Sequence, residues 1–373
     1  MTSPSQSTDR SDAGSERIES RRPISRRTTL QSLGVIFTGV GAGCIGGSGP
    51  SSDRIRWRKS IRGQPLLDGG TLYVMGRLTL HALSPTDGSK QWVTEYSEDD
   101  FDQRLCLHSD IAVDDRRIYV PGCDGLRAIR RSDGEQAWFV DSPLRQGVGV
   151  GGGRVYANAE ELLAIDASSG AVVWRADTGG DHLTTPAATA DGVVFTNRVD
   201  GVVTAFDVDG ERRWEHRTDA ETRGPTIAGD TVYVAMSTEP GKAGRLLALN
   251  RADGTVRWTV DTPSPKRGTA PVVDGDAVYL GCSGREHGTL VALDRRDGTE
   301  RWSFTDENST VYEPAVTDDA VYAGSNDNQV YAFSRTGELL WQVETNSVVG
   351  TVVAGKEFLY AANNERLFAI DPS

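Results

Sequence analysis

Eight tryptophans recur along this chain at intervals of 35 to 46 residues, and their spacing constrains the fold more than any other feature. They are Trp57, Trp92, Trp138, Trp174, Trp214, Trp258, Trp302 and Trp341. From the second onward each lies four residues after a glycine, and these glycines are Gly88, Gly134, Gly170, Gly210, Gly254, Gly298 and Gly337. Two residue types that recur together at such a period predict a repeat architecture. Only Trp57 lacks the upstream half of its repeat.

Each repeat contains four short stretches with the character of β-strands, most clearly over residues 270–302. Short strands separated by Gly and Asp turns are typical of an antiparallel meander. The third stretch always carries an alanine, and these are Ala82, Ala128, Ala164, Ala205, Ala248, Ala292, Ala332 and Ala369. A fixed small residue there predicts close approach of another sheet. Four-stranded meanders of about 40 residues arranged radially form a β-propeller.

The number of alanines predicts eight blades, although only seven tryptophans follow a third strand. The last copy, residues 350–370, is followed by no turn and no tryptophan. Residues 53–59, which contain Trp57, can supply its missing fourth strand and leave no bare edge. We therefore predict an all-β fold over residues 54–373: an eight-bladed propeller of four-stranded antiparallel blades, whose last blade is closed by the N-terminal strand.

The repeat unit, best seen in residues 164–174, has the form A-x-D-x-x-x-G-x-x-x-W and resembles that of the pyrroloquinoline-quinone (PQQ) propeller family. The resemblance covers residues 54–373 and implies that each indole packs on the backbone of the next blade, where it buries roughly 150–250 Å². The family includes PQQ-dependent dehydrogenases and non-enzymatic propellers, among them a lipoprotein that scaffolds outer-membrane protein assembly in bacteria. This chain looks like the non-enzymatic branch.

The sequence contains no HExxH motif, no GxSxG motif in a strand-turn-helix context and no P-loop. Adjacent cysteines and long active-site insertions, which the resemblance would imply for a PQQ-dependent dehydrogenase, are also missing; the longest inserts are polar loops at 97–103, 237–244 and 283–288. Gly151–Gly153 is interpreted as a hairpin turn, and the pairs at 99–100 and 318–319 as solvated aspartates. We predict no catalytic, cofactor or metal residues and a scaffold function. PQQ with Ca²⁺ in an oxidoreductase, or small-molecule binding at the cell surface, are the alternatives.

The N-terminal segment resembles a twin-arginine export signal that ends in a lipobox. Arg26 and Arg27 precede a modestly apolar stretch, which is too short to span a bilayer and ends at Cys44. We expect residues 1–44 to act as the signal, lipid on Cys44 to anchor the chain at the outer face of the cytoplasmic membrane, and residues 45–53 to form a tether. Thr29 and Gly41 depart from the usual pattern, and an unprocessed anchor or a buried helix is the alternative.

The chain is acidic and poor in lysine. Its formal net charge is −13, and only five of its 40 basic residues are lysines: Lys59, Lys90, Lys242, Lys266 and Lys356. Such a surface suits molar salt, where the Debye length is about 3 Å, and indicates a salt-adapted archaeal source. A high-GC genome is the alternative explanation. The charge argues against nucleic acid as a partner, because phosphate binding needs a basic footprint; we expect a monomeric propeller with an unidentified protein partner.

The remaining cysteines are interpreted as structural. Cys123 and Cys282 occupy equivalent places in different repeats, where the seventh repeat has Ser325. We expect a small side chain packed against a neighbouring strand at this position. Whether Cys106 pairs with Cys123 is left open, and no disulfide is predicted.

One pattern goes beyond the fold. The loops that enter the first strands carry basic or titratable residues in six of the eight repeats: Arg62, His108, Arg145, His182, Arg223, and Lys266 with Arg267. A propeller gathers such loops at one mouth of its channel, so they are candidates for a positive ring that holds an anionic ligand or an acidic segment of a partner. The alternative is local pairing of these side chains with carboxylates such as Asp181 or Glu221.

Overall fold

The computed structural model describes most of the chain after residue 51. The described ranges are 52–76, 78–96, 111–122, 124–144, 147–178, 188–190, 193–197, 201–237, 244–263, 270–283, 287–307 and 309–373. They belong to a compact unit that spans Ser48–Ser373. Within these ranges, no helix has the length and apolar character needed to cross a membrane.

The strands form eight four-stranded sheets, which we call blades and number along the chain. Blades 1 and 2 consist of β2 (Gln64–Asp68), β3 (Thr71–Met75), β4 (Thr79–Leu83) and β5 (Lys90–Glu95), and of β6 (Ala112–Val113), β7 (Arg117–Pro121), β8 (Gly125–Arg130) and β9 (Gln136–Asp141). Blades 3 and 4 consist of β10 (Val148–Gly151), β11 (Arg154–Asn158), β12 (Leu162–Asp166) and β13 (Val172–Ala176), and of β14 (Ala188–Ala190), β15 (Val193–Asn197), β16 (Val202–Phe206) and β17 (Arg212–Arg217).

Blades 5 and 6 consist of β18 (Glu221–Ala228), β19 (Thr231–Ser237), β20 (Gly244–Asn250) and β21 (Val256–Thr262), and of β22 (Val272–Asp274), β23 (Ala277–Ser283), β24 (His287–Asp294) and β25 (Glu300–Glu307). Blade 7 consists of β26 (Ala315–Val316), β27 (Ala320–Gly324), β28 (Gln329–Ser334) and β29 (Leu339–Glu344). Blade 8 consists of β30 (Val349–Ala354), β31 (Leu359–Asn363), β32 (Leu367–Ile370) and β1 (Ile55–Lys59), which follows the short 3-10 helix η1 (Ser52–Arg54).

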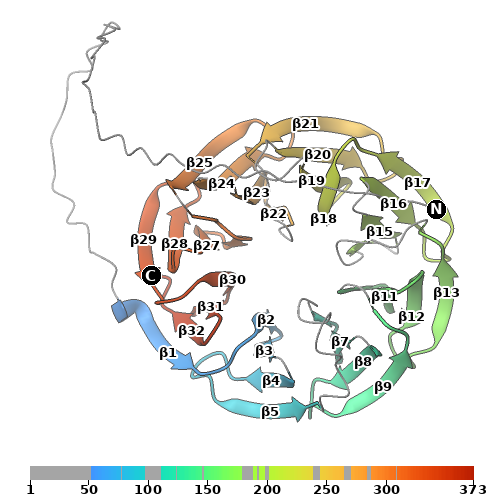
Figure 1. Ribbon diagram of the computed structural model, residues 1–373, viewed down its shortest axis with the longest axis horizontal. Helices are drawn as coiled ribbons and strands as arrows, with labels where there is room; N and C mark the ends of the chain where they lie inside the picture. Colours follow the sequence, from blue (N-terminus) through green and yellow to red (C-terminus); the bar gives the residue numbers. More distant parts are fainter. Residues whose placement is uncertain are drawn as a thin grey trace, which may run out of the picture. The chain divides into compact units, whose positions relative to one another are not determined.

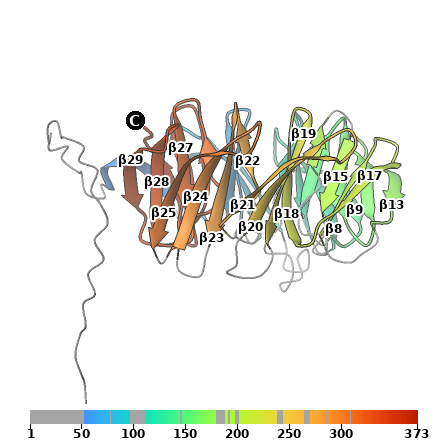
Figure 2. The same cartoon turned by 90° about the horizontal axis from the view of Figure 1, so that it is seen from above.

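The blades lie around a ring with their first strands innermost and their fourth strands on the rim (Figure 1). Seen edge-on, the strands run between two faces of the ring (Figure 2). The prediction of an all-β propeller with four-stranded antiparallel blades is confirmed. Ring closure follows the predicted route, since β1 pairs antiparallel with β32 and places Trp57 opposite Ala369. The main-chain amide of Asp371 then donates to the carbonyl of Arg54 over 2.8 Å.

The recurring alanine is required by packing within its own blade, which the sequence did not predict. All eight alanines are fully buried, and each lies opposite the tryptophan of the fourth strand and opposite an aromatic residue of the second. In blade 3, for example, Ala164 pairs with Trp174 on one side and Tyr156 on the other. The two rings lean toward each other over the methyl group, with centroids 5.9 Å apart. Close packing of side chains within one blade, and not only the approach of another sheet, therefore requires the small residue.

Each indole also fastens its blade to the next one, as the family resemblance implied. The Nε1 atoms of Trp57, Trp92, Trp138, Trp174, Trp214, Trp258, Trp302 and Trp341 donate to the carbonyls of Thr86, Arg131, Ala167, Val208, Arg251, Arg295, Arg335 and Pro372, over 2.6–3.2 Å. The acceptor belongs to the turn after the third strand of the following blade; for Trp341 that strand is β32. We call each such junction a seam and name it by its two blades.

The glycine of the repeat belongs to the same contact. Gly298 has a φ of 77°, and a Cβ on it would lie 2.8 Å from the indole of Trp258 in the preceding blade. The equivalent distance from Gly337 to Trp302 is 2.6 Å. Glycine is therefore required twice over, by a left-handed backbone and by a ring that covers the turn.

Two smaller expectations concern loops. Residues 151–153 do form a hairpin turn, with Gly152 and Gly153 at φ values of 59° and 72°. Within two of the predicted polar loops, residues 238–243 and 284–286 lie outside the described residues. Both loops are shorter than predicted, because Ser237 pairs with Gly244, and Ser283 pairs with Gly288 at the ends of β23 and β24. Those strands bury Cys282 completely, and burial raises the pKa of its thiol. This is the packing role predicted for that position.

A candidate anion site between blades 5 and 6

The basic residues predicted at the channel mouth fall largely outside the described residues. These are His108, Arg145, His182, Lys266 and Arg267. Arg223 lies in β18, but its side chain is likewise outside the description, and Arg62 is exposed just before β2. The lipidation and export residues Cys44, Arg26 and Arg27, and the cysteines Cys106 and Cys123, also lie outside it. Each of these assignments stays a prediction.

In the ranges that the structure describes, no group of three or more His, Cys, Asp or Glu side chains lies close enough together to hold a metal ion. The aspartates at 318 and 319 are exposed residues between β26 and β27, as expected for solvated turn residues. The strongest candidate site has a different character and is rich in arginine.

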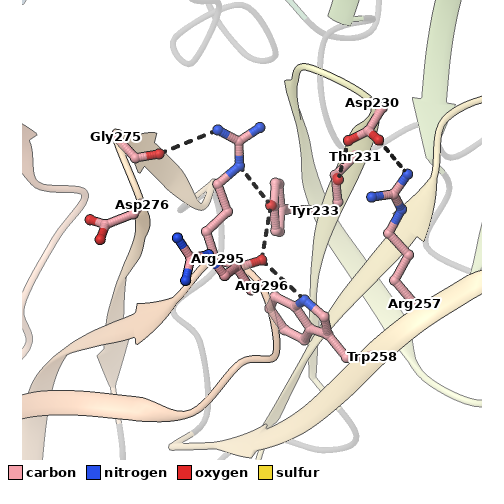
Figure 3. A pocket seen from close by; sticks show the side chains of 9 residues that line it. All are labelled: Asp230, Thr231, Tyr233, Arg257, Trp258, Gly275, Asp276, Arg295 and Arg296. Atoms are coloured by element: carbon pink, nitrogen blue, oxygen red, sulfur yellow. Dashed lines mark hydrogen bonds and ion pairs between the residues drawn. The ribbon is translucent and has the colours of Figure 1, made fainter.

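A hollow of about 320 Å³ lies at the seam between blades 5 and 6 (Figure 3). Its lining residues come from both blades, and they are Asp230, Thr231, Tyr233, Arg257, Trp258, Gly275, Asp276, Arg295 and Arg296. Three of these side chains are arginines and two are aspartates, so the lining carries an excess of positive charge in a protein whose net charge is −13.

The turn between β24 and β25 positions the two arginines of blade 6. The carboxylate of Asp294 accepts the amide of Arg296 over 2.8 Å, and the amide of Gly298 donates to the Asp294 carbonyl over 2.9 Å. Trp258 then fixes the turn against blade 5 through its hydrogen bond to the Arg295 carbonyl, at 3.2 Å. The tryptophan seam therefore places Arg295 over the preceding blade.

The guanidinium of Arg295 bridges the two blades through neutral acceptors only. Nε donates to the hydroxyl of Tyr233 over 3.2 Å, and Nη2 donates to the carbonyl of Ala228 over 2.7 Å. On its own blade, Nη1 donates to the carbonyl of Gly275 over 3.3 Å. Among the described residues no carboxylate lies within ion-pair distance of Arg295. Its charge is thus held at the seam by dipoles and not by a counter-ion.

The acidic residues of the hollow already have partners. Asp230 pairs with Arg257 at 2.7 Å, and Asp276 pairs with Arg301 at 2.7 Å. The hydrogen bond from Arg257 lowers the pKa of Asp230, and the one from Arg301 lowers the pKa of Asp276. Arg296 is exposed at the rim of the same hollow. Both carboxylates are therefore ionised at neutral pH and engaged with other arginines.

Sequence reasoning missed this hollow although part of its signal is visible. An arginine stands three residues after the repeat alanine in four copies: Arg131, Arg251, Arg295 and Arg335. What faces each of them comes from the preceding repeat, more than 60 residues earlier for Arg295. That partner becomes visible only when the strands of neighbouring blades are placed in the three-dimensional structure.

The fold and its seams define a PQQ-like β-propeller, in which one indole per repeat docks each blade on the next. The sequence matches the family described as Outer membrane protein assembly factor BamB over residues 10–139, 123–281 and 242–373. The chain belongs to this family.

A curated relative, the Outer membrane protein assembly factor BamB of Alkalilimnicola ehrlichii, is 30% identical over 184 residues, which are 47% of this chain and 46% of the relative. The match thus spans about half the length of that relative. BamB from Moraxella catarrhalis has a similar structure, with a TM-score of 0.66 at 18% identity over 85% of this chain and 99% of that one. A quinohemoprotein alcohol dehydrogenase from Pseudomonas putida gives a TM-score of 0.68 at 14% identity over 85% and 76%. Both structural likenesses establish the fold alone.

Proposed function

We propose that this chain is a binding and assembly scaffold of the cell envelope, exported and anchored to the membrane by its N-terminus. The observation that carries the proposal is the family match, which extends over residues 10–373. The curated relative from Alkalilimnicola ehrlichii is named an outer membrane protein assembly factor, as is the family itself. A scaffold binds protein, so its function lies in surfaces and not in a catalytic constellation.

The seams support this reading. All eight indoles donate to a neighbouring blade and pack over the blade's own alanine. None is left to stack on a planar cofactor. The rigid ring that results holds its loops in fixed positions, which suits recognition of a partner.

The predicted export signal and lipid anchor at the N-terminus extend the proposal to the location of the protein. Arg26 and Arg27 would direct the folded chain through the twin-arginine route, and lipid on Cys44 would hold it at the outer face of the cytoplasmic membrane. A salt-adapted source accounts for the charge of −13 and the five lysines. Both inferences rest on the sequence.

The experiment is a capture of the tagged full-length chain, expressed at its native level, from membranes solubilised in mild detergent. We expect one polypeptide to co-purify in stoichiometric amount, and Cys44→Ser to move the chain out of the membrane fraction. The matched control is Cys282→Ser, which changes a buried thiol that plays no part in export. A parent chain that is extracted alone, with no stoichiometric partner, contradicts the scaffold function.

A quinoprotein oxidoreductase is the second candidate, because the similarity to the Pseudomonas putida dehydrogenase covers 85% of this chain. Its test is direct. Purified protein mixed with PQQ and Ca²⁺ would acquire cofactor absorbance and oxidise alcohols with an artificial dye as electron acceptor. Binding of a small molecule such as a sugar at the cell surface is a third reading, which calorimetry with sugars addresses.

A further inference from the structure

Three seams of the propeller place an arginine against the tyrosine of the preceding blade's second strand, and at two of them a carboxylate of that blade pairs with the arginine. At the seam between blades 1 and 2, Arg131 donates from Nε to the hydroxyl of Tyr73 over 3.0 Å and forms an ion pair with Asp68 at 2.6 Å. At the seam between blades 6 and 7, Arg335 lies over the ring of Tyr279 at 5.4 Å and pairs with Asp274 at 2.6 Å. In both, a carboxylate of the preceding blade neutralises the guanidinium.

At the seam between blades 5 and 6 the equivalent of that carboxylate is a methyl group. Asp68, Asp274 and Ala228 each pair with the residue three positions later, across the turn between the first and second strands of their blades. The register therefore aligns these three positions. Arg295 makes the same hydrogen bonds to the tyrosine hydroxyl and the strand-end carbonyl as Arg131 does, and no carboxylate among the described residues takes the place of Asp68.

The seam between blades 4 and 5 also has an alanine at this register position, because Ala190 pairs with Val193 as Ala228 pairs with Thr231. Arg251, at the seam between blades 4 and 5, donates to the carbonyl of Gly229 over 3.3 Å, but it faces β14, whose side chains are not described. The remaining seams have Pro85, Ala167, Val208 or Pro372 in place of the arginine. Arg295 is thus the seam arginine whose surroundings on the preceding blade are described and hold no carboxylate within ion-pair distance among the described residues.

Open space lies beside the guanidinium that lacks a carboxylate. The hollow of about 320 Å³ is lined by Arg295 and by the exposed Arg296, and both side chains extend from one turn in Figure 3. A guanidinium presents a planar fork of donors that matches the two oxygens of a carboxylate. Asp230 and Asp276 are already paired with Arg257 and Arg301. Neither carboxylate of the hollow therefore competes with an incoming anion for the guanidinium of Arg295.

We propose that this hollow binds a carboxylate side chain from an acidic segment of a partner polypeptide. The carboxylate occupies the place that Asp68 and Asp274 fill at the other two seams, with Arg295 as its main donor and Arg296 as its second. The inference rests on the proposed function, because it requires that the chain bind protein. It deepens that function by naming where on the ring a partner docks and the chemistry that recognises it.

The test supplies the missing carboxylate within the chain. Ala228→Asp places an aspartate opposite Arg295, as at the other two seams, and Ala228→Asn is the matched control of the same size without charge. The probe is a synthetic peptide of alternating Glu and Ser, titrated into the full-length chain in detergent at low ionic strength and followed by calorimetry. Acetate and inorganic phosphate are titrated separately to define the class of anion.

We expect the peptide to bind the parent, Ala228→Asn to stay within about twofold of it, and Ala228→Asp to weaken binding at least about tenfold, which corresponds to roughly 1.4 kcal/mol. Arg296→Gln should weaken it by a smaller factor. Equal binding to parent and Ala228→Asp overturns the proposal, as does binding of phosphate with no binding of acetate or peptide. The melting temperatures of the variants show that each one is folded.

The two proposals can fail separately. If membrane capture yields a stoichiometric partner that Ala228→Asp retains as well as the parent does, the scaffold function stands and the carboxylate site is wrong. If the peptide binds as expected and no partner is captured, the site stands and the scaffold function is wrong.

Discussion

The two seams that flank blade 6 have almost the same contacts and different electrostatics. On one side Trp258 docks on the turn that carries Arg295, and on the other Trp302 docks on the turn that carries Arg335. The tryptophans, glycines and tyrosines occupy equivalent places at both. The residue that faces the arginine differs, being Ala228 at the first seam and Asp274 at the second. Trp302 also contacts the ring of Phe333, with centroids 5.9 Å apart, where the first seam has Leu293.

This difference separates stability from recognition. Packing of the indole and the alanine recurs at every seam, and the glycine turn recurs at all but the seam between blades 7 and 8, so this packing cannot distinguish the two seams that flank blade 6. The charge opposite the arginine does vary, and it is confined to a partly exposed place where an ion pair contributes little to stability, about 0–1 kcal/mol. A substitution of the residue that faces the arginine can therefore free the guanidinium for binding while the free energy of unfolding changes little.

The largest effect is expected from removal of the indole at either seam. Trp258→Ala and Trp302→Ala each lose the ring contact and the hydrogen bond to the next blade, which should lower the free energy of unfolding by about 3–5 kcal/mol. Denaturant unfolding measures both. Both variants lose the same hydrogen bond and glycine contact, and Trp302→Ala also loses the ring contact with Phe333, so we expect its loss to be larger by about 0.5–1 kcal/mol. A much smaller loss for Trp258→Ala would show that the seam with the hollow is already weakly docked.

The glycines come next. Gly298→Ala and Gly337→Ala force a Cβ into the preceding indole from a left-handed backbone, and we expect each to cost about 2–3 kcal/mol. Gly275→Ala is the matched control: it has a φ of 57° and its Cβ would lie 3.8 Å from the nearest atom, in Arg335. It therefore carries the backbone strain alone, about 1 kcal/mol. Equal losses for all three variants would exclude the steric contribution.

Asp274→Ala should have a small effect on stability and a clear effect on binding. The pair that it breaks is 27% exposed at Arg335 and 42% exposed at Asp274, so the free energy of unfolding should fall by less than about 1 kcal/mol. The substitution removes the counter-ion of Arg335 and reproduces the Ala228 arrangement one blade further on. Calorimetry with the acidic peptide should then detect a second equivalent bound. If the stoichiometry remains one, an uncompensated seam arginine is not sufficient for binding.

The smallest effect concerns the seam that closes the ring, where polar contacts of the chain ends replace the glycine turn. Hydrogen bonds from Ser373 and Arg56 lower the pKa of Asp371 well below its ordinary value of 3.8. A depressed pKa stabilises the fold fully above that ordinary value, and the contribution is lost as the pH falls through the folded-state pKa. Asp371→Asn should therefore have a lower free energy of unfolding than the parent at pH 6, by less than about 1 kcal/mol, and the difference should be smaller, without vanishing, at pH 2. A constant gap at both pH values would contradict this assignment.

Most of the fold is predictable from the sequence because the repeat presents the same physical requirements many times. A glycine at positive φ and an indole four residues later recur at fixed spacing, and Trp57 without its glycine indicates the strand that closes the ring. The role of the alanine is harder to predict, because it depends on two rings that approach from the strands on either side. Ser283 in a strand was likewise missed, since a long hairpin and a polar loop have similar composition.

The candidate site is predictable only in part. Arg295 and Arg296 are visible as a pair in the turn of the sixth repeat, but nothing local shows what faces them. Ala228 belongs to another repeat and is unremarkable by itself among the chain's alanines. The predicted ring at the channel mouth, with Arg62 as its described member, remains a sequence hypothesis.

The sequence by itself determined the repeat, the strands and the antiparallel blades, because these follow from turn chemistry and short-range alternation within about 40 residues. The tertiary structure decided which residues of neighbouring repeats meet. It placed Arg295 against Ala228, where Arg335 meets Asp274, and so left the guanidinium of Arg295 with no carboxylate partner among the described residues. The physical reason is that charge compensation at a seam depends on two blades at once, whereas the formation of each blade depends mainly on its own strands.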